Sequence, residues 1–351
     1  MTNLRDSRRS LRPLAFAVFA LASSAASHAV AAHAAPSVHP PYQLSVFARS
    51  ANGYSQPDSM VQWGDSIVVG FQNHVAKDGT DGKSSTIVQY ALNGRVQRTF
   101  SVPGHNDGLR LIGQDELWAL QNEDANPNLV IIDLETGRQT LYTFPPSTTP
   151  HGGGFDDIVE LGGNVYFTAS NPGTDSNGVN IFPALVRVRI HGRTNTVDVE
   201  PVMFGNASAI DIPTGATVQL NLSDPDSMTV DPRGNIAFTS QSDGELIFVR
   251  NPLTSNQVIG RLPITAGGAA TTIDDTAFAT STAAFMLFAD VAGDTIYRLD
   301  SAPFGFAPGT AYSGSDTTGV LGTLNLDTGV VTPVATGFHS VRGIVFVTPL
   351  H

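Results

Sequence analysis

The chain has 351 residues, no cysteine and a formal net charge of −12 at pH 7. These values exclude disulfides, a thiolate metal site and a cysteine nucleophile, and they argue against nucleic acid or an anionic membrane as a partner. Hydrophobic residues make up 41% of the chain and charged residues 14%, which favours a packed, β-rich protein over a disordered one.

The first 35 residues are predicted to be an export signal. Residues 1–13, MTNLRDSRRSLRP, are basic, and an Ala- and Ser-rich run follows, with Ala-x-Ala cleavage options near Ala34 and Ala35. The SRRSLR segment is typical of a twin-arginine signal. The run is too weakly apolar for a permanent membrane anchor. We therefore expect a secreted or periplasmic mature chain, residues 36–351, that forms a single domain without a membrane span.

An aspartate recurs ahead of short apolar runs and serves as an anchor for aligning them. In chain order the anchors are Asp58, Asp107, Asp156, Asp226 and Asp275, at intervals of 49, 49, 70 and 49 residues. Arg342, in HSVRGIVFV, holds the same position in a sixth run. A period near 50 residues is the signature of a propeller or a solenoid.

Each anchor run is followed by a second apolar run, and these are SIVVGF, ELWAL, NVYFTA, NIAFTS and AFMLFA. The rest of a unit is a hairpin, such as STIVQYALNGRVQRTFSV with its Asn-Gly turn or GTLNLDTGVVTPVA near the end. Four antiparallel strands repeated radially form a β-propeller. We predict an all-β propeller with six blades, with five blades as the alternative. In the six-bladed form, RGIVFV supplies an inner strand and YQLSVFARS an outer strand of a reduced closing blade.

Two units are longer than the repeat. The third gains 21 residues, which we place within 204–225, and the fifth, counted to Arg342, gains 18 residues within 291–319. Long loops on a regular scaffold are common places for function. Placed in this way, both loops are expected on the same face as the anchors.

A second set of oxygen-bearing side chains recurs fifteen residues after each anchor. Its members are Asn73, Asn122, Asn171, Gln241 and Asp290. Because the first two strands of a blade are antiparallel, both sets should meet at one rim of the central channel. Carboxylates this close raise one another's pKa unless a cation joins them, and calcium accepts carboxylate and amide oxygens together. We therefore expect Ca²⁺ or another divalent cation; alternatively, each aspartate only caps a turn.

Residues 223–240, SDPDSMTVDPRGNIAFTS, resemble the signature of gluconolactonase and senescence-marker-like propellers, and the layout is similar to NHL-type propellers. The resemblance implies a six-bladed hydrolase with a divalent metal in its channel. It implies that Asp226 is a metal ligand, that Asp58 stands in place of the family's first-strand glutamate, and that Asn122 and Asn171 stand in place of its asparagine ligands. The repeat itself adds the candidate ligands Asp107, Asp156 and Asp275.

Three histidines in loops that enter inner strands are candidate general bases for the attack of water: His105, His151 and His339. The alternative for each is a structural histidine that is bonded to the backbone.

Arg342 is a candidate substrate-binding residue for a carboxylate or a phosphate. In the alternative, which we favour, it neutralises part of the acidic ring. Gln241 and Asp290 are further candidate substrate contacts. The acidic segment NEDANPN, residues 122–128, can bring Glu123 or Asp124 to a site at a strand end.

Two functions remain open for this exported propeller. One is a metal-dependent hydrolase of a small ester or lactone, in which Asp226 holds the cation that polarises the carbonyl. The other is a non-catalytic scaffold whose rim binds a small molecule or a cell-envelope ligand. The resemblance favours the hydrolase, and a monomer is expected.

Overall fold

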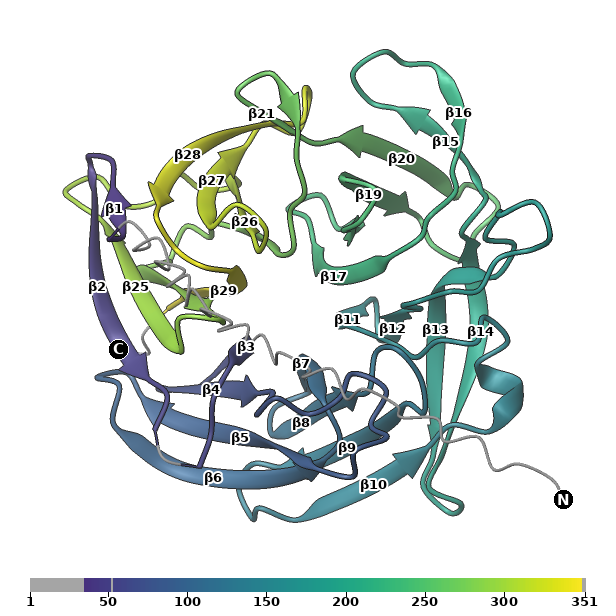
Figure 1. The fold of residues 1–351 in the computed structure, drawn as a ribbon, viewed down its shortest axis with the longest axis horizontal. Coiled ribbons are helices and arrows are strands. Elements are labelled where there is room, and N and C mark those ends of the chain that lie inside the picture. Colours follow the sequence, from purple (N-terminus) through teal and green to yellow (C-terminus); the bar gives the residue numbers. More distant parts are fainter. Residues whose placement is uncertain (1–34, 52, 349–351) are drawn as a thin grey trace, which may run out of the picture. The chain divides into compact units, whose positions relative to one another are not determined.

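Strands supply nearly all the regular structure of the protein in a computed structural model, which describes residues 35–51 and 53–348. The predicted export signal therefore lies outside the described residues, except for Ala35. In the described ranges the only helix is a 3-10 turn at Pro146–Thr148. These ranges contain no helix that is both long and apolar enough to cross a membrane. The sheets surround a central axis, with one inner strand of each nearest to it (Figure 1).

Antiparallel pairing groups successive strands in fours through the first two thirds of the chain. The first two groups are β3 (Pro57–Trp63), β4 (Ser66–Phe71), β5 (Ser84–Ala91) and β6 (Val96–Pro103), then β7 (Asn106–Ile112), β8 (Glu116–Gln121), β9 (Asn128–Asp133) and β10 (Gln139–Thr143). The next two are β11 (Ile158–Leu161), β12 (Asn164–Thr168), β13 (Pro183–His191) and β14 (Thr196–Phe204), then β17 (Pro225–Val230), β18 (Ile236–Ser240), β19 (Glu245–Arg250) and β20 (Val258–Pro263).

The last two groups exchange strands along the chain. One consists of β23 (Thr276–Phe278), β26 (Ala311–Ser315), β27 (Val320–Leu324) and β28 (Val330–Thr336). The other consists of β29 (Val341–Val347), β24 (Phe285–Asp290), β25 (Thr295–Ser301) and β2 (Tyr42–Arg49). The predicted closure, with an inner strand from the C-terminal end and an outer strand from the N-terminal end, is therefore observed. These groups confirm the predicted β-propeller.

The strand exchange corrects one expectation. We predicted that AFMLFA would be the second strand of the unit that begins at Asp275, but this segment, β24, pairs with β29. The partner of β23 is β26, which follows both β24 and β25 in the chain. The closing blade is thus a full four strands rather than a reduced one, because it takes β24 and β25 from the middle of the preceding unit.

Short strands extend two of the sheets at their outer edges. The hairpin of β15 (Ser208–Asp211) and β16 (Thr217–Gln219) joins β20 through a parallel β15–β20 pair. The strands β1 (Ser37–Val38), β21 (Thr265–Ala266) and β22 (Ala269–Ala270) extend the sheet of β28. The segment predicted within residues 204–225 therefore adds to an outer edge, whereas we had expected it on the face of the anchors.

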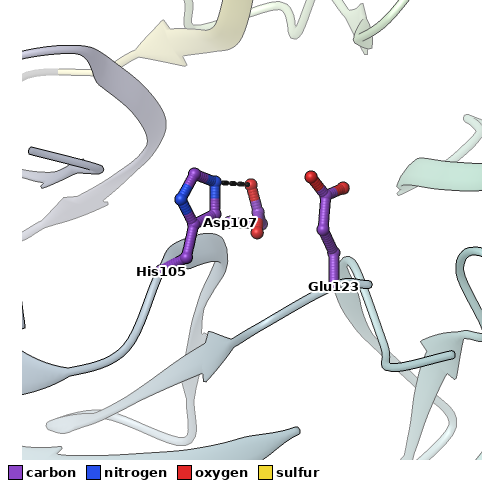
Figure 2. A group of neighbouring side chains, drawn as sticks. All are labelled: His105, Asp107 and Glu123. Carbon is purple, nitrogen blue, oxygen red and sulfur yellow. Dashed lines mark ion pairs between the residues drawn. The ribbon is translucent and has the colours of Figure 1, made fainter. Parts of the chain in front are cut away.

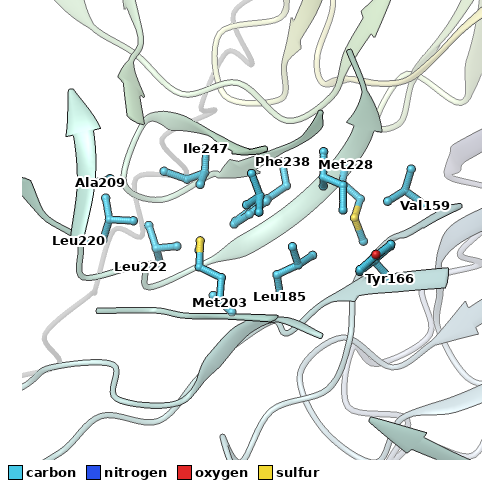
Figure 3. Close-up of a cluster of buried hydrophobic side chains, with 13 residues drawn as sticks. Val159, Tyr166, Leu185, Met203, Ala209, Leu220, Leu222, Met228, Phe238 and Ile247 are labelled. Atoms are coloured by element: carbon cyan, nitrogen blue, oxygen red, sulfur yellow. The ribbon is translucent and has the colours of Figure 1, made fainter. Parts of the chain in front are cut away.

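Apolar side chains fill the space between neighbouring sheets. In one cluster, Val159 and Leu185 of the β11–β14 group meet Met228, Phe238 and Ile247 of the β17–β20 group (Figure 3). Alternate residues of a strand point to the same face of its sheet, so the short apolar runs place apolar side chains against the neighbouring sheet. Burying a side chain of this size stabilises the fold by about 1.5–3 kcal/mol. The packing holds the inner strands, whose first residues form the site described next.

Candidate functional site

A backbone bulge near the start of the inner strands carries the repeated aspartate. In β3 the pairing register shifts between Pro57 and Met60, and β7 and β17 shift at the matching place. A bulge inserts an extra residue and re-aims its side chain. The aspartates in these bulges are Asp58, Asp107 and Asp226, and each is only 5–6% exposed.

Asp156 and Asp274 hold the equivalent places ahead of β11 and β23. The amides of Asp156 and Asp274 each donate to a carbonyl oxygen of the neighbouring strand, at 3.1 and 2.8 Å. In return, an amide of that strand donates to the carbonyl oxygen of the next residue, which is Asp157 or Asp275. The anchor of this unit is therefore Asp274, and not Asp275 as the 49-residue interval predicted. The interval from Asp226 is 48 residues, one fewer than the repeat.

Asp275 lines the interior of the channel with Asp157, around a cavity of about 280 Å³. Asp275 accepts a hydrogen bond from the amide of Gly343, and Asp157 accepts one from the amide of Met228 at 2.8 Å. Burial and then the charge of Asp157 raise the pKa of Asp275 to about 6. Both carboxyl groups thus link adjacent inner strands.

Arg342 supplies the counterion of the aspartate ring from β29. Its Nε lies 3.1 Å from Asp274 Oδ2, its Nη1 lies 3.7 Å from Asp58 Oδ2, and its Nη2 donates to Asp316 Oδ2 at 3.3 Å. With three carboxylates around it, the guanidinium offers little to a substrate anion. The geometry favours the neutralising role that we preferred for this residue.

His105, Asp107 and Glu123 form a compact buried group beside this ring. His105 lies just before β7, Asp107 lies in β7, and Glu123 follows β8. One potential ligand atom of each lies within 4.8 Å of the others, and each residue is 4–5% exposed. Figure 2 shows the imidazole and the two carboxyl groups converging from these separate segments. The sequence predicted His105 and Asp107 as individual candidates, but it left open whether Glu123 or Asp124 of the NEDANPN segment reaches a site.

The imidazole of His105 has a fixed orientation. Its Nδ1 donates to the carbonyl oxygen of Val75 at 2.7 Å, because a carbonyl oxygen only accepts. Its Nε2 therefore faces the group, 3.3 Å from Asp107 Oδ1. Burial opposes the charged imidazolium, but the carboxylate of Asp107 raises the pKa of His105 to about 9. Oδ2 of Asp107 has no hydrogen-bond partner among the described residues, and Nε2 of His105 can take a ligand once it has lost its proton.

Lys77 and Gln72 complete the surroundings of this group from the end of β4 and the loop that follows. The ammonium of Lys77 pairs with Oε1 of Glu123, and its side chain is half exposed. Gln72 Nε2 donates to Asp58 Oδ2 and, at 2.9 Å, to Asp107 Oδ1. No sequence pattern pointed to either residue, because this loop has only the polar composition of an ordinary surface loop.

Three carboxyl groups share protons at the other side of the group. Burial, and after it the charges of Asp226 and Glu123, raise the pKa of Asp156 well above its usual value. Burial and the charge of Glu123 raise the pKa of Asp226 to about 7. Burial also opposes ionisation of Glu123, but a hydrogen bond from Asp156 and the charge of Lys77 lower the pKa of Glu123. Of the three groups, Asp156 is therefore a carboxyl group that keeps its proton readily, and Glu123 is the one that loses it most readily.

The described part of the ring and its surroundings carries an excess of acids. Seven carboxyl groups face three basic groups: Asp58, Asp107, Glu123, Asp156, Asp226, Asp274 and Asp316 against Lys77, His105 and Arg342. Such a cluster either keeps protons at neutral pH or accepts a further cation. One buried nitrogen and two carboxyl groups that converge within 4.8 Å fit a divalent metal ion.

The three asparagines of the second repeated set bond mainly to backbone. Oδ1 of Asn73 accepts from a backbone amide at 3.0 Å, and Oδ1 of Asn122 accepts from the amide of His105 at 2.8 Å. Nδ2 of Asn171 donates to the carbonyl oxygen of Asp124 at 3.2 Å. All three have positive φ values, 57°, 65° and 45°, which asparagine adopts more readily than most residues. Asn122 therefore positions His105.

Gln241 and Asp290 also bond within the protein. Gln241 Nε2 donates to Asp274 Oδ2 at 2.5 Å, next to Arg342. Oδ1 of Asp290 accepts from the amides of His339 and Ser340, each at 3.0 Å, and its Oδ2 lies 3.2 Å from Nδ1 of His339. Asp290 thus holds the turn that leads into β29.

His151 and His339 differ from His105 in their surroundings. Nε2 of His151 donates to the carbonyl oxygen of Gly154 at 2.7 Å, and burial lowers the pKa of this 2% exposed residue. The side chain of His339 is 47% exposed and pairs with Asp290. Of the three predicted bases, His105 is the one within the carboxylate group.

No family model and no curated protein matches the chain. Solved structures similar to it include the periplasmic gluconolactonase of Pseudomonas aeruginosa, at 12% identity over 84% of this chain and 89% of that one, with a TM-score of 0.49. They also include virginiamycin B lyase of Staphylococcus aureus, at 14% identity over 74% and 99%, with a TM-score of 0.45. A streptogramin B lyase is similar at 15% identity over 85% and 87%, with a TM-score of 0.45. At these values the likeness does not extend to activity or site residues.

Proposed function

We propose that the protein is an exported hydrolase of a small ester or lactone that depends on a divalent metal ion. The observation that carries the proposal is the buried group of His105, Asp107 and Glu123, whose ligand atoms converge within 4.8 Å at the carboxylate ring. Groups with strongly perturbed pKa values around a buried, charged cluster are characteristic of functional sites.

The donor set supports a borderline or transition metal more than calcium. Calcium takes six to eight oxygen ligands, whereas an imidazole nitrogen suits zinc and similar ions, and carboxylates suit manganese as well. Mn²⁺ or Zn²⁺ therefore fits His105, Asp107 and Glu123 better than the Ca²⁺ expected from the sequence. When bound, such an ion supplies Lewis-acid polarisation of the substrate carbonyl.

The chain's own residues set up this site in the absence of a ligand. The carbonyl oxygen of Val75 fixes the ring of His105, and Gln72 holds the carboxyl group of Asp107. Lys77 keeps Glu123 ionised, and its half-exposed side chain leaves it free to move. Metal binding then requires His105 to lose its proton, so metal affinity should rise with pH.

Asp226 is the proposed general base. A pKa of about 7 lets a carboxyl group exchange protons at neutral pH, which is the requirement for general acid–base catalysis. Asp156 provides a neighbouring proton donor, so a proton taken from water by Asp226 has a path to the leaving group. In this assignment Asp226 acts on the water rather than as the metal ligand that the resemblance implies.

The test is hydrolysis of a panel of lactones and aryl esters by the purified mature protein, with Mn²⁺, Zn²⁺ or Ca²⁺ and with chelator. We expect turnover that disappears with chelator and returns with Mn²⁺ or Zn²⁺. Asp226→Asn should abolish turnover while leaving metal binding in place. Absence of turnover across the panel in every metal would reject the hydrolase and favour the non-catalytic scaffold.

Export has its own test. We expect the mature protein outside the cytoplasm, without residues 1–35, and intact-mass measurement of exported protein reads this directly. A retained N-terminus would contradict the export signal without bearing on the hydrolase.

A further inference from the structure

A second cavity lies at the opposite end of β17 from Asp226. It has a volume of about 390 Å³, which is within the range of small-molecule sites. Its lining includes Pro232 and Arg233 of the β17–β18 turn and Phe248 and Arg250 of β19. Nothing in the proposed hydrolase uses this cavity, because Asp226 begins β17 and the turn follows its end.

Both segments that exceed the sequence repeat contribute to this cavity. Ile210 and Ile212 come from the segment within residues 204–225, and Gly309 comes from the segment within residues 291–319. These segments are far apart in the chain and are separated by the whole β17–β20 group. The residues added to the repeat in these two segments therefore line one cavity.

The wall built by the first segment is rigid. The amide of Ile212 donates to the carbonyl oxygen of Arg261 at 2.9 Å, and Arg261 Nη1 lies 3.1 Å from Asp211 Oδ1. At Gly260 a Cβ would lie 3.3 Å from Cδ1 of Ile212, so the glycine gives this isoleucine its room. The cavity is therefore pre-formed by the parallel pairing of β15 with β20.

The lining combines apolar walls with cationic groups. Ile210 is 39% exposed, an unusual exposure for an isoleucine unless it faces a ligand or partner, and Phe248 lies beside it in the lining. The side chains of Arg233 and Arg250 are exposed and make no ion pair or hydrogen bond within residues 35–51 and 53–348.

The acids of the lining, Asp231 and Asp327, form no ion pair with these arginines in the described residues. The carboxyl group of Asp231 is occupied by the amides of Arg233 and Asn235, both at 2.8 Å, and by Nδ2 of Asn235 at 2.7 Å. Asp327 lies exposed on the far side, in the turn after β27. The lining thus carries two guanidinium and two carboxylate groups, and the donors of both guanidinium groups remain open to an anionic ligand.

We propose that this cavity binds an organic anion with an apolar body, of the size of a medium-chain carboxylate. Arg233 and Arg250 bind the anionic head, since guanidinium matches a carboxylate in a bidentate geometry. Ile210, Ile212 and Phe248 cover the apolar body. The site is separate from the carboxylate ring and does not depend on the proposed hydrolase.

The test compares octanoate with octylammonium and octanol, which share one chain length and differ in the charge of the head. Binding to the mature protein is measured by calorimetry and by shifts of backbone amide resonances. We expect octanoate to bind at least about tenfold more tightly than octylammonium, with octanol between them. Shifts should centre on residues 210–212 and 231–235.

Variants locate the site. The double variant Arg233→Gln/Arg250→Gln should weaken octanoate binding at least about tenfold, and Ile210→Ser should weaken it with either head group. Arg189→Gln removes an exposed arginine of β13 as the matched control and should change nothing. All substituted side chains are exposed, so melting curves should confirm folded variants. Equal binding of octylammonium, retention of octanoate by the double variant, or no binding of octanoate up to about 10 mM would each overturn the proposal.

Discussion

Nε of Arg342 lies 3.1 Å from Oδ2 of Asp274, and this pair joins the last inner strand, β29, to the residue ahead of β23. The two residues come from neighbouring blades whose strands are exchanged along the chain. Arg342 takes the place at which the other blades carry an aspartate. It therefore offsets part of the charge of a ring that would otherwise consist of carboxyl groups alone.

Replacement of this arginine should destabilise the protein strongly. Arg342→Met leaves Asp58, Asp274 and Asp316 without their cation, and breaking a buried pair in this way costs about 3–5 kcal/mol. The matched control is Arg187→Met, which removes a pair with the exposed Glu200 and should cost about 1 kcal/mol or less. Denaturant unfolding measures both, and similar losses would show that Arg342 does not carry the charge balance.

Metal ions should stabilise the folded protein through Glu123. At a metal concentration of about 100 times Kd, binding to the native state adds about 2.7 kcal/mol, or about 5 °C in Tm for a chain of this size. Glu123→Gln should remove most of this gain in Mn²⁺ or Zn²⁺ and cost little extra in chelator. Glu135→Gln, on an exposed turn, is the control. A metal-dependent gain that survives in Glu123→Gln would place the ion elsewhere.

The resemblance to gluconolactonase-like propellers predicts a different pattern, with Asp226 as the ligand. Asp226→Ala would then lower Tm in metal much more than in chelator. Under our assignment the metal-dependent gain persists in Asp226→Ala while turnover is lost. The same pair of melting curves, with metal and with chelator, separates the two roles.

Stability in chelator should fall as pH rises from about 4 to about 7. The pKa of Asp226 is about 7 in the folded protein and 3.8 as its ordinary value, so the native state binds the proton more tightly than the unfolded state does. A group of this kind stabilises fully below its unfolded pKa and loses that contribution as pH passes the folded pKa. Asp226→Asn should flatten this decline and raise Tm at pH 8 by several degrees. An unchanged slope would mean that Asp226 is not the titrating group.

Gly343 closes the ring at the joint of β29 with β3. It has φ of +58°, and a Cβ there would lie 2.0 Å from the carbonyl oxygen of Asp58. Gly343→Ala should therefore cost more than the roughly 1 kcal/mol of an unfavourable backbone conformation. Gly64→Ala is the control, because Gly64 has φ of +55° and open space around it. Equal costs for the two variants, read by denaturant unfolding, would remove the steric argument.

The repeating elements could be predicted from the sequence. Short apolar runs with turn residues between them fix strands locally, because alternate residues of a strand share a face and Asn-Gly or Thr-Gly turns reverse the chain. A constant interval then brings equivalent residues to one rim, which placed Asp58, Asp107, Asp156 and Asp226 correctly around the channel. The same pattern predicted that β2 and β29 are the outer and inner strands of the blade that closes the ring.

The long-range partners that complete the site could not be predicted, because they depend on the folded arrangement of the strands. The pairing of β24 with β29 depends on which sheet has a vacant edge, and no local pattern records this. The shift from Asp275 to Asp274 arises from one residue fewer between two bulges, which alters which side chain faces the rim. Lys77 and Glu123 meet across two loops because of the packing of adjacent blades. Ion pairs of this kind depend on the distance between residues in the folded protein, and the order of residues in the chain does not specify that distance.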